Sequence, residues 1–422
     1  MKRNWPQCTL SVIVLLLVLR MVVASAYRSA TAESGLAQGD FHIYYAAAAR
    51  LRDGQPLYRA TSGTGAGQAQ YVYTPLIAML TVPLTRWSLG TATRMWTAVC
   101  IFAMLAACGI FVATLGFAAP LKMPLVLFVV LTTFRYWPTE IELGLGNVQM
   151  ILLVLSCTMM WAVHRNRWRW FIALFVLSVL TKTWMVGLLA VPIAERRWSV
   201  AGWCLLALAL SFITMFASVG FQQIYDFAAI TRSFSRQPDL ICHSFYGFAH
   251  EYLAPNSLIE PFSRDPRLRY AFLALAYCSV GVGFLMIVSS GPASGPHQRT
   301  VRFALMLVCM LLVLPVCHVM YYVLALPAIW ILVAGALHHQ HPAQSRYAAG
   351  FLCGILGYLL LSYPFPGTTP VPAPYKYGGL LSLRAATPLF SAMLFCIGLI
   401  PAAFARPLIA VGRDVVSCSA YE

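Results

Sequence analysis

The stretch "LSVIVLLLVLRMVV", Leu10–Val23, carries a single charged side chain, Arg20. Comparable apolar runs of about 20 residues recur along the chain, and each can cross the roughly 30 Å hydrocarbon core of a membrane as a helix. The 422 residues are 60% hydrophobic and 10% charged, whereas a soluble domain has about 25% charged residues. The sequence therefore predicts an all-α polytopic membrane protein that forms one integral membrane domain over residues 1–422.

The basic loops give an orientation, because Lys and Arg collect on the cytoplasmic side of membrane proteins. We expect 11–13 helices, with crossings near 9–27, 95–117, 121–137, 147–163, 168–181, 183–194, 198–220, 268–290, 301–317, 319–337, 346–363 and 385–405. Residues 9–220 would form the core, and 268–405 would form the C-terminal helices. Both termini would lie inside, and the large outer loops would be 28–94, 221–267 and 364–384. The first run could instead be a signal peptide, but an uncleaved span fits Arg20 better.

Two segments do not fit simple crossings. Segment 74–90, "TPLIAMLTVPLTRWSLG", is apolar, but a full crossing would place the basic "HRNRWR" loop outside. We therefore predict that it enters the membrane only in part. Segment 168–194 has basic residues at both ends, and each half is short for a span. A broken helix pair that turns near Lys182 fits, provided that protein or a wet cavity surrounds the turn.

Charge and cysteine content exclude two other classes of partner. The net charge is +16, but the basic residues are scattered over short loops, so anionic lipid rather than nucleic acid explains them. The 12 cysteines lie mostly in apolar runs without metal-ligand spacing, so we expect neither a metal nor a cofactor. "GTGAG" (63–67) is not a phosphate loop. "HHQH" (338–341) could bind a metal, but its place in a short inner loop makes a metal site unexpected. The Pro-rich segment 364–379 is more typical of a rigid lid or spacer than of a ligand motif.

The acids are concentrated on the predicted outer face. Ten of 13 lie there: Glu33, Asp40, Asp53, Glu140, Glu142, Asp226, Asp239, Glu251, Glu260 and Asp265. Any carboxylate chemistry is therefore expected on the outer side.

Asp40 opens the segment "DFHIYYAAAARLR", in which Phe41, Tyr44, Ala48 and Leu51 recur at helical spacing. This pattern predicts an amphipathic helix that lies on the outer surface. Asp40 stands where a helix N-cap belongs. A carboxylate at the end of a span could also take a proton from a sugar hydroxyl. The sequence alone leaves both roles open.

Further polar residues are predicted on the same face. Tyr73 belongs to an interfacial aromatic belt or lines a sugar site. Asn147 caps a helix or, with Gln149, binds substrate hydroxyls. Lys182 is the one charge well inside residues 170–194; at membrane depth it is a functional candidate whose partner would be an anion such as phosphate, although a salt bridge or snorkelling is the alternative. The remaining candidates, which a structural role would also explain, are His243, Ser244 and His318.

The order of these elements resembles the GT-C membrane glycosyltransferases, and in particular glycosyltransferase family 87, the polyprenol-phosphate-mannose-dependent mannosyltransferases. The resemblance covers residues 9–337. The matching elements are Asp40-Phe41-x-x-Tyr44-x-x-Ala47 with Gly54-x-x-Leu57-Tyr58, "YTPL" at 73–76, "GNVQ" at 146–149 with its amides exchanged, Lys182, and Arg196-Arg197-Trp198. The chain departs from the family at "CHVMYY": His318 replaces a usual tryptophan, and Met320 and Tyr321 replace histidines. These departures put the contacts made there, and the sugar, in doubt.

The resemblance implies a membrane glycosyltransferase without metal. It would move a sugar, expected to be mannose, from a polyprenyl-phosphate donor to a glycolipid or glycan acceptor at the outer face of a bacterial-type cell membrane, with inversion. Asp40 would be the general base, and Lys182 with Arg232 would hold the donor phosphate. The residues expected to contact sugar or acceptor are Tyr44, Tyr45, Tyr73, Asn147, Gln149, His243, Ser244, His318 and Tyr321.

Two other classes of protein fit a chain of this kind. One is a transporter or flippase of a lipid-linked sugar, which should show internal repeats and paired broken helices. No clear repeat is present, and Lys182 is the one strongly intramembrane charge. The other is an inactive assembly subunit.

Overall fold

The architecture comes from a computed structural model that describes residues 16, 20, 39–58, 70–115, 119–234, 242–255, 261–263, 265–338, 344–362 and 386–404. These residues are mainly helical, and no strand occurs among them. The predicted all-α class is confirmed. The first predicted span, 9–27, lies almost entirely outside the described residues, as do the motifs at 63–67 and 364–379 and the side chains of 338–341.

The elements follow one another as short and long helices. They are α2 (Asp40–Arg52), α3 (Pro75–Thr81), η1 (Val82–Arg86), α4 (Leu89–Leu115), α5 (Ala119–Phe134), α6 (Trp137–Leu145), α7 (Gln149–His164), α8 (Trp168–Thr181), η2 (Thr183–Leu189), α9 (Ala190–Ala194), α10 (Trp198–Val219), α11 (Gln222–Phe234), α12 (Phe245–Tyr252), α13 (Pro266–Ser289), α14 (Pro296–Val313), η3 (Val319–Ala325), α15 (Leu326–His338), α16 (Gln344–Ser362) and α18 (Thr387–Phe404). Elements labelled η are 3-10 helices.

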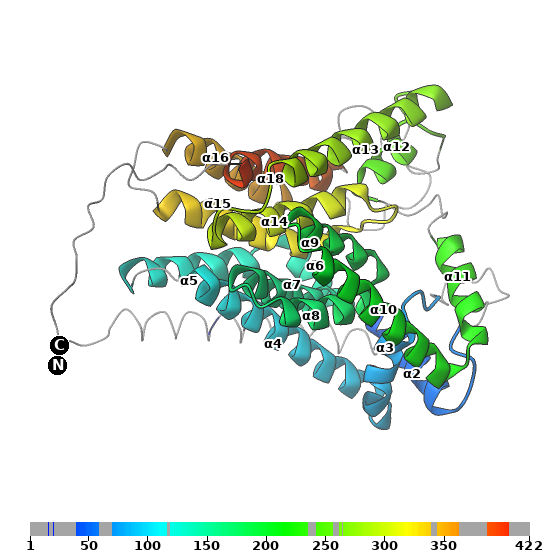
Figure 1. The fold of residues 1–422 in the computed structure, drawn as a ribbon. Coiled ribbons are helices and arrows are strands. Elements are labelled where there is room, and N and C mark those ends of the chain that lie inside the picture. The colour runs from blue at the N-terminus through cyan, green and yellow to red at the C-terminus, as the bar shows by residue number, and fades with distance from the viewer. Residues whose placement is uncertain are drawn as a thin grey trace, which may run out of the picture.

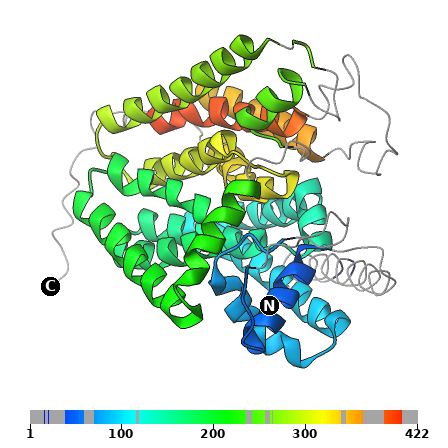
Figure 2. The same cartoon turned by 90° about the vertical axis from the view of Figure 1, so that its right-hand side faces the viewer.

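The helices form one bundle around α7 and α14 (Figure 1). α7 packs against α4, α8, α14 and η3, and α14 packs against α18, α15 and η3 as well. In Figure 1, α4, α8 and α10 lie below this centre, α5 lies level with α7, and α13, α16 and α18 lie above it. The view at 90° keeps the same order from bottom to top (Figure 2). The centre of the bundle therefore lies between the N-terminal and the C-terminal helices.

Four described helices, α4, α10, α13 and α18, are long and apolar enough to cross a membrane. Only 11% of the most apolar window of α13 and 28% of that of α10 are buried inside the protein. Their exposed side chains include Leu206, Leu210, Leu275 and Leu285. Because such a surface is stable only against lipid, these two helices form outer walls of the bundle. The other described helices do not meet both criteria, and several of them, such as α7 and α8, are shorter apolar helices.

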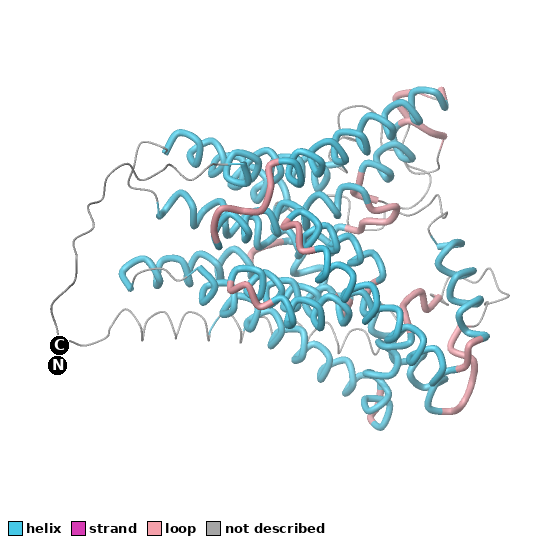
Figure 3. Tube along the Cα trace, in the orientation of Figure 1, coloured by secondary structure: helices cyan, strands magenta, loops and turns pink. Residues whose placement is uncertain are grey.

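The two irregular segments are built from short pieces. α3 and η1 together cover about 20 Å at 1.5–2 Å per residue, which is less than the roughly 30 Å of a membrane core. α8 ends at Thr181, and Lys182 is extended, with φ −143° and ψ 117°. η2 then returns against α8. The predicted break at Lys182 is confirmed, and Figure 3 shows such loops between the helices.

Two glycines allow α2 to reach the start of α7. Gly39 lies so close to the end of α6 that a Cβ there would be 2.5 Å from the carbonyl oxygen of Leu145. Gly146 has φ +66° and ends α6 in the left-handed region. The indole of Trp96 on α4 donates to the Gly146 carbonyl (2.7 Å) and stacks on Phe41 (5.3 Å). α2, α4 and α6 are thus fixed together immediately before Asn147.

Candidate active site

Asn147 joins two candidates that come from distant segments. Its side-chain amide donates to Oδ2 of Asp40 and to the hydroxyl of Tyr73 (3.1 Å). Asn147 is buried and Asp40 is half-buried. Oδ1 of Asp40 accepts no hydrogen bond from any described residue. One carboxylate oxygen is therefore oriented by the protein, and the other is left for a ligand.

The helix caps predicted from sequence are not formed by these residues. α2 begins at Asp40 itself, Gly39 is its N-cap, and no side chain caps it. The N-cap of α7 is Val148, again without a side-chain cap. Asp40 and Asn147 bond to each other, and neither is the N-cap of its helix, so the capping interpretation of both residues is wrong. Oδ1 of Asn147 does accept from the backbone N–H of Val148 (2.6 Å), the N-cap residue of α7. Asp40 still places its negative charge in the first turn of α2, where the helix dipole favours it.

Tyr73 is held at the point where the chain enters α3. The hydroxyl of Tyr58 donates to the Tyr73 carbonyl (2.7 Å), and the ring of Tyr44 meets the Tyr73 ring edge-on at 4.9 Å. The hydroxyl of Thr74 donates to the carbonyl of Leu180, two residues before Lys182. The "YTPL" segment therefore links the Asp40 network to the end of α8.

Lys182 lies beside this network. Its residue is 5% exposed, and its Nζ lies 3.8 Å from the ring centroid of Tyr321 and 5.1 Å from that of Tyr73. Both contacts are within the range of cation–π attraction. Nζ donates no hydrogen bond to any described residue, while Asp40 and Glu142 attract its charge. A buried ammonium in this state can still donate up to three hydrogen bonds to an anion.

Glu142 is a site residue that sequence reasoning did not single out. It is fully buried on α6, and its Oε1 accepts from the backbone N–H of Gln149 (2.6 Å). Burial raises the pKa of Glu142 to about 8, and Lys182 opposes that rise. The signal available in the sequence was an acid four residues before Gly146, on a short helix that leads to "GNVQ".

η3 covers the lysine from the other side. Tyr321 is buried and stacks on Trp184 of η2 at 5.6 Å, and its ring meets the ring of His318 edge-on at 5.6 Å. The backbone N–H of His243 donates to the Cys317 carbonyl (2.7 Å). The Tyr321 ring thus packs against the Lys182 ammonium. His318 and His243 both lie next to the segment 317–321 that leads into η3. Trp184 is a second residue that sequence reasoning missed.

Comparison with known proteins gives the family of the chain. The sequence profile of glycosyltransferase family 87 matches residues 71–317, more than half of the chain. The chain belongs to glycosyltransferase family 87. No curated protein matches it significantly. It is therefore a membrane glycosyltransferase, an integral membrane enzyme with a sugar donor and an acceptor as substrates.

The matched region of this glycosyltransferase includes most of the cluster. Tyr73, Glu142, Asn147, Gln149 and Lys182 lie within it. Asp40 precedes it, and Tyr321 follows it. The hydrogen bond from Asn147 is therefore the direct link between Asp40 and the family region.

Three predicted contact residues have other bonds in the glycosyltransferase. The hydroxyl of Tyr45 donates to the Trp87 carbonyl (2.8 Å) and joins α2 to the end of η1. Ser244 is the N-cap of α12 and accepts from the backbone N–H of Gly247 (3.1 Å). These two hydroxyls act as structural partners. Arg232 is exposed on α11 and lines a pocket between α10 and α11, away from the Asp40–Lys182 cluster.

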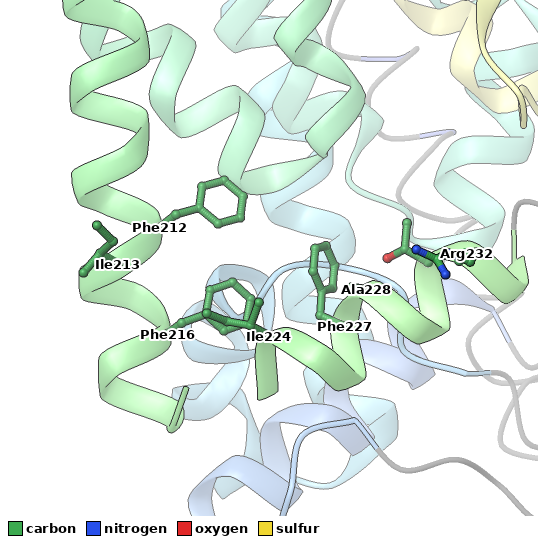
Figure 4. A pocket seen from close by; sticks show the side chains of 8 residues that line it. Phe212, Ile213, Phe216, Ile224, Phe227, Ala228 and Arg232 are labelled. Atoms are coloured by element: carbon green, nitrogen blue, oxygen red, sulfur yellow. The ribbon is translucent and has the colours of Figure 1, made fainter. Parts of the chain in front are cut away.

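This pocket has a volume of about 490 Å³ and is mainly apolar (Figure 4). Phe212 and Phe216 of α10 and Phe227 of α11 line it. The ring of Phe227 lies 5.6 Å from that of Tyr58. Arg232 is therefore next to the aromatic support of the site, and no contact with Lys182 is found among the described residues. The described residues also contain no group of three or more His, Cys, Asp or Glu that could hold a metal ion.

Proposed function

We propose that this glycosyltransferase moves a sugar, expected to be mannose, from a polyprenyl-phosphate donor to a glycolipid or glycan acceptor at the outer face of a bacterial-type cell membrane. The observation that carries the proposal is the pairing of a half-buried carboxylate, Asp40, with a buried ammonium, Lys182, that has no hydrogen-bond partner among the described residues. This pairing supplies one group for a proton and one group for a departing phosphate.

Lys182 suits the phosphate of the donor. When the bond between the sugar and the phosphate breaks, negative charge grows on the phosphate oxygen. An ammonium already in place at low dielectric stabilises that charge without reorganising in the reaction. The rings of Tyr73 and Tyr321 hold Nζ between them. Arg232, expected from sequence to share this role, lies on α11, so the proposal assigns the phosphate to Lys182 alone.

Asp40 suits the acceptor. An acceptor hydroxyl attacks the anomeric carbon, and the new C–O bond forms as the bond to the phosphate oxygen breaks and its electron pair leaves with the phosphate. The hydroxyl proton goes to Oδ1 of Asp40, while Asn147 holds Oδ2. One displacement on the side opposite the phosphate inverts the anomeric centre.

Two further features support a lipid-linked donor. An apolar cavity of about 520 Å³ lies between α13, α14 and α18, and Gly187 and Ala190 of the segment that follows Lys182 line its edge. Because α13 is largely exposed to lipid, a prenyl chain could reach this cavity laterally. Trp184, which is only partly buried, offers an aromatic face on which a sugar ring can stack.

The outer-face assignment follows from the loops. The site is made by α2, α3 and α6, which are short elements between the predicted crossings, and by η3, which begins the predicted crossing 319–337. The basic clusters at Arg165–Arg169 and Arg196–Arg197 lie at the opposite ends of α7 and η2–α9. Basic loops mark the cytoplasmic side, so the site would face outward.

The test compares purified wild type with Asp40→Asn. Both are given radiolabelled polyprenyl-phosphate mannose and a membrane glycolipid extract. Loss of a general base should lower turnover by about 10²- to 10⁴-fold, with an unchanged elution profile on size exclusion. Near wild-type turnover by the variant would exclude Asp40 as the base. If wild type transfers sugar from none of the polyprenyl-phosphate donors, the proposed donor is refuted.

A further inference from the structure

Glu142 and Gln149 form a second polar pair beneath Asp40 and Asn147. Glu142 is on α6 and Gln149 is the first residue of α7. Both side chains are fully buried. One oxygen of Glu142 receives the Gln149 backbone N–H, so this half of the carboxylate stabilises the start of α7.

The other polar atoms of the pair have no protein partner. Oε2 of Glu142 and both Oε1 and Nε2 of Gln149 are buried and form no hydrogen bond with any described residue. The large majority of buried polar atoms in proteins are paired, so three such atoms at one place call for an explanation. A ligand that brings both donors and acceptors would satisfy all three.

We propose that Glu142 and Gln149 bind hydroxyl groups of the donor sugar, with Glu142 as a specificity-determining residue of the reaction; this inference rests on the proposed function. Neighbouring sugar hydroxyls present donors and acceptors side by side. A carboxyl oxygen with an amide beside it can pair with both. Glu142 thus recognises the donor sugar, while Asp40 acts on the acceptor.

The donor rather than the acceptor sugar is favoured by charge. Among charged groups, Lys182 acts most strongly on Glu142, ahead of Asp40. In the donor, the sugar is bonded directly to the phosphate, so a phosphate at Lys182 brings the sugar hydroxyls near the lysine. Glu142 therefore lies on the donor side of the site.

The alternative role for Glu142 is that of a counter-ion that only places Lys182. The two roles differ in their response to the sugar. A counter-ion affects every donor equally, because each carries the same phosphate. A hydroxyl contact affects only donors that carry that hydroxyl.

The experiment measures kcat/KM for polyprenyl-phosphate mannose and for its 2-, 3-, 4- and 6-deoxy analogues. Wild type should disfavour at least one analogue by roughly 5- to 150-fold, the cost of leaving a buried polar group without its hydrogen-bond partner. Glu142→Gln should reduce transfer of the natural sugar and bring that discrimination down to about 3-fold or less. Glu140→Gln, on the same helix, should discriminate as wild type does.

A second variant separates binding from folding. Gln149→Met keeps the length of the side chain and removes two polar atoms that have no internal partner. It should fold as well as wild type, judged by its melting temperature in detergent, while KM for the natural donor rises at least about 10-fold.

Three results would overturn the inference. They are equal use of all the deoxy analogues by wild type, unchanged discrimination in Glu142→Gln, and unchanged KM in Gln149→Met. If wild type transfers mannose and Asp40→Asn does not, any of these results refutes this inference alone. If wild type uses no polyprenyl-phosphate sugar, the proposed function fails, and the inference fails with it.

Discussion

The bundle buries charge at both ends of α7, but in different ways. At one end, Lys182 has aromatic neighbours and no hydrogen-bond partner among the described residues. At the other end, Arg302 and Glu195 lie 3.7 Å apart and are 3% and 7% exposed. The arginine also donates to carbonyls of Gly291 (2.6 Å) and Ala403 (3.2 Å).

Both ends are tied to the same helix. Gln149 begins α7 at the active site, and His164 ends it with Nδ1 3.0 Å from the hydroxyl of Thr300 on α14. Arg299 donates to the Val163 carbonyl (3.1 Å) at that same end. A buried charge whose bonds are all supplied by the chain stabilises the fold. A buried charge left without them is, under the proposed function, available to bind a substrate.

Replacing the unpartnered charge tests the active-site end of this comparison. In Lys182→Met, we expect turnover to fall by about 10³-fold, because the phosphate loses its preorganised cation. The apparent melting temperature should stay close to that of wild type, since no hydrogen bond is lost. Transfer assays and thermal unfolding in detergent measure the two effects. A clearly lower melting temperature for Lys182→Met would instead indicate that the lysine has a structural role.

Replacing the partnered charge should give the opposite result. Arg302→Met leaves the Glu195 carboxylate buried without its cation, and removing one partner of a buried pair costs about 3 kcal/mol or more. We expect a clear drop in the apparent melting temperature, while turnover per folded molecule stays within about 2-fold, because the site lies at the other end of α7. Equal melting of variant and wild type would contradict the comparison.

A pH series sharpens the contrast through Glu142. Its pKa rises from 4.5 in the unfolded chain to about 8 in the fold. The folded protein therefore holds this proton more tightly, so the stability it contributes is complete below about pH 4.5 and is lost as the pH rises to about 8. Wild type should lose more melting temperature over this interval than Glu142→Gln does. If the melting temperatures of the two proteins change with pH in parallel, the Glu142 carboxyl is not the cause of the pH dependence.

The smallest effect is expected at an exposed ion pair. Asp53 accepts from Nε of Arg52 (2.8 Å), and both side chains are nearly half exposed. Solvent and salt screen such pairs. Asp53→Asn should therefore leave both turnover and melting temperature unchanged within error at 0.15 M salt. A marked loss of either would mean that exposed charges on α2 influence the site.

Much of the fold could be predicted because membrane chemistry constrains it strongly. Apolar runs without charges indicated the helices, and basic flanks around 168–194 indicated the break at Lys182. The number of complete crossings could not be predicted, since short helices such as α7 and α8 are buried by protein neighbours that hydropathy does not reveal.

The site was predicted in part. Asp40, Tyr73, Asn147 and Lys182 carry family-like motifs and do meet in space. Glu142 was missed because an acidic residue in a predicted loop is expected to be exposed to solvent. Only the packing of α6 shows that it is buried. The helix caps expected at Asp40 and Asn147 were wrong, because α2 begins one residue earlier and α7 one residue later than those caps require, and the two side chains bond to each other. That choice depends on a contact between residues far apart in the sequence.

The cover that Tyr321 places over Lys182 has a consequence for biosynthesis. η3 is made long after α2 and α8, and domains at the N-terminus generally fold first during synthesis. Until η3 packs on α6 and α7, the lysine has only one of its two aromatic neighbours. If Lys182 holds the donor phosphate as proposed, a nascent chain that has inserted most of its helices still lacks a complete site, and we expect activity only once the C-terminal third is made.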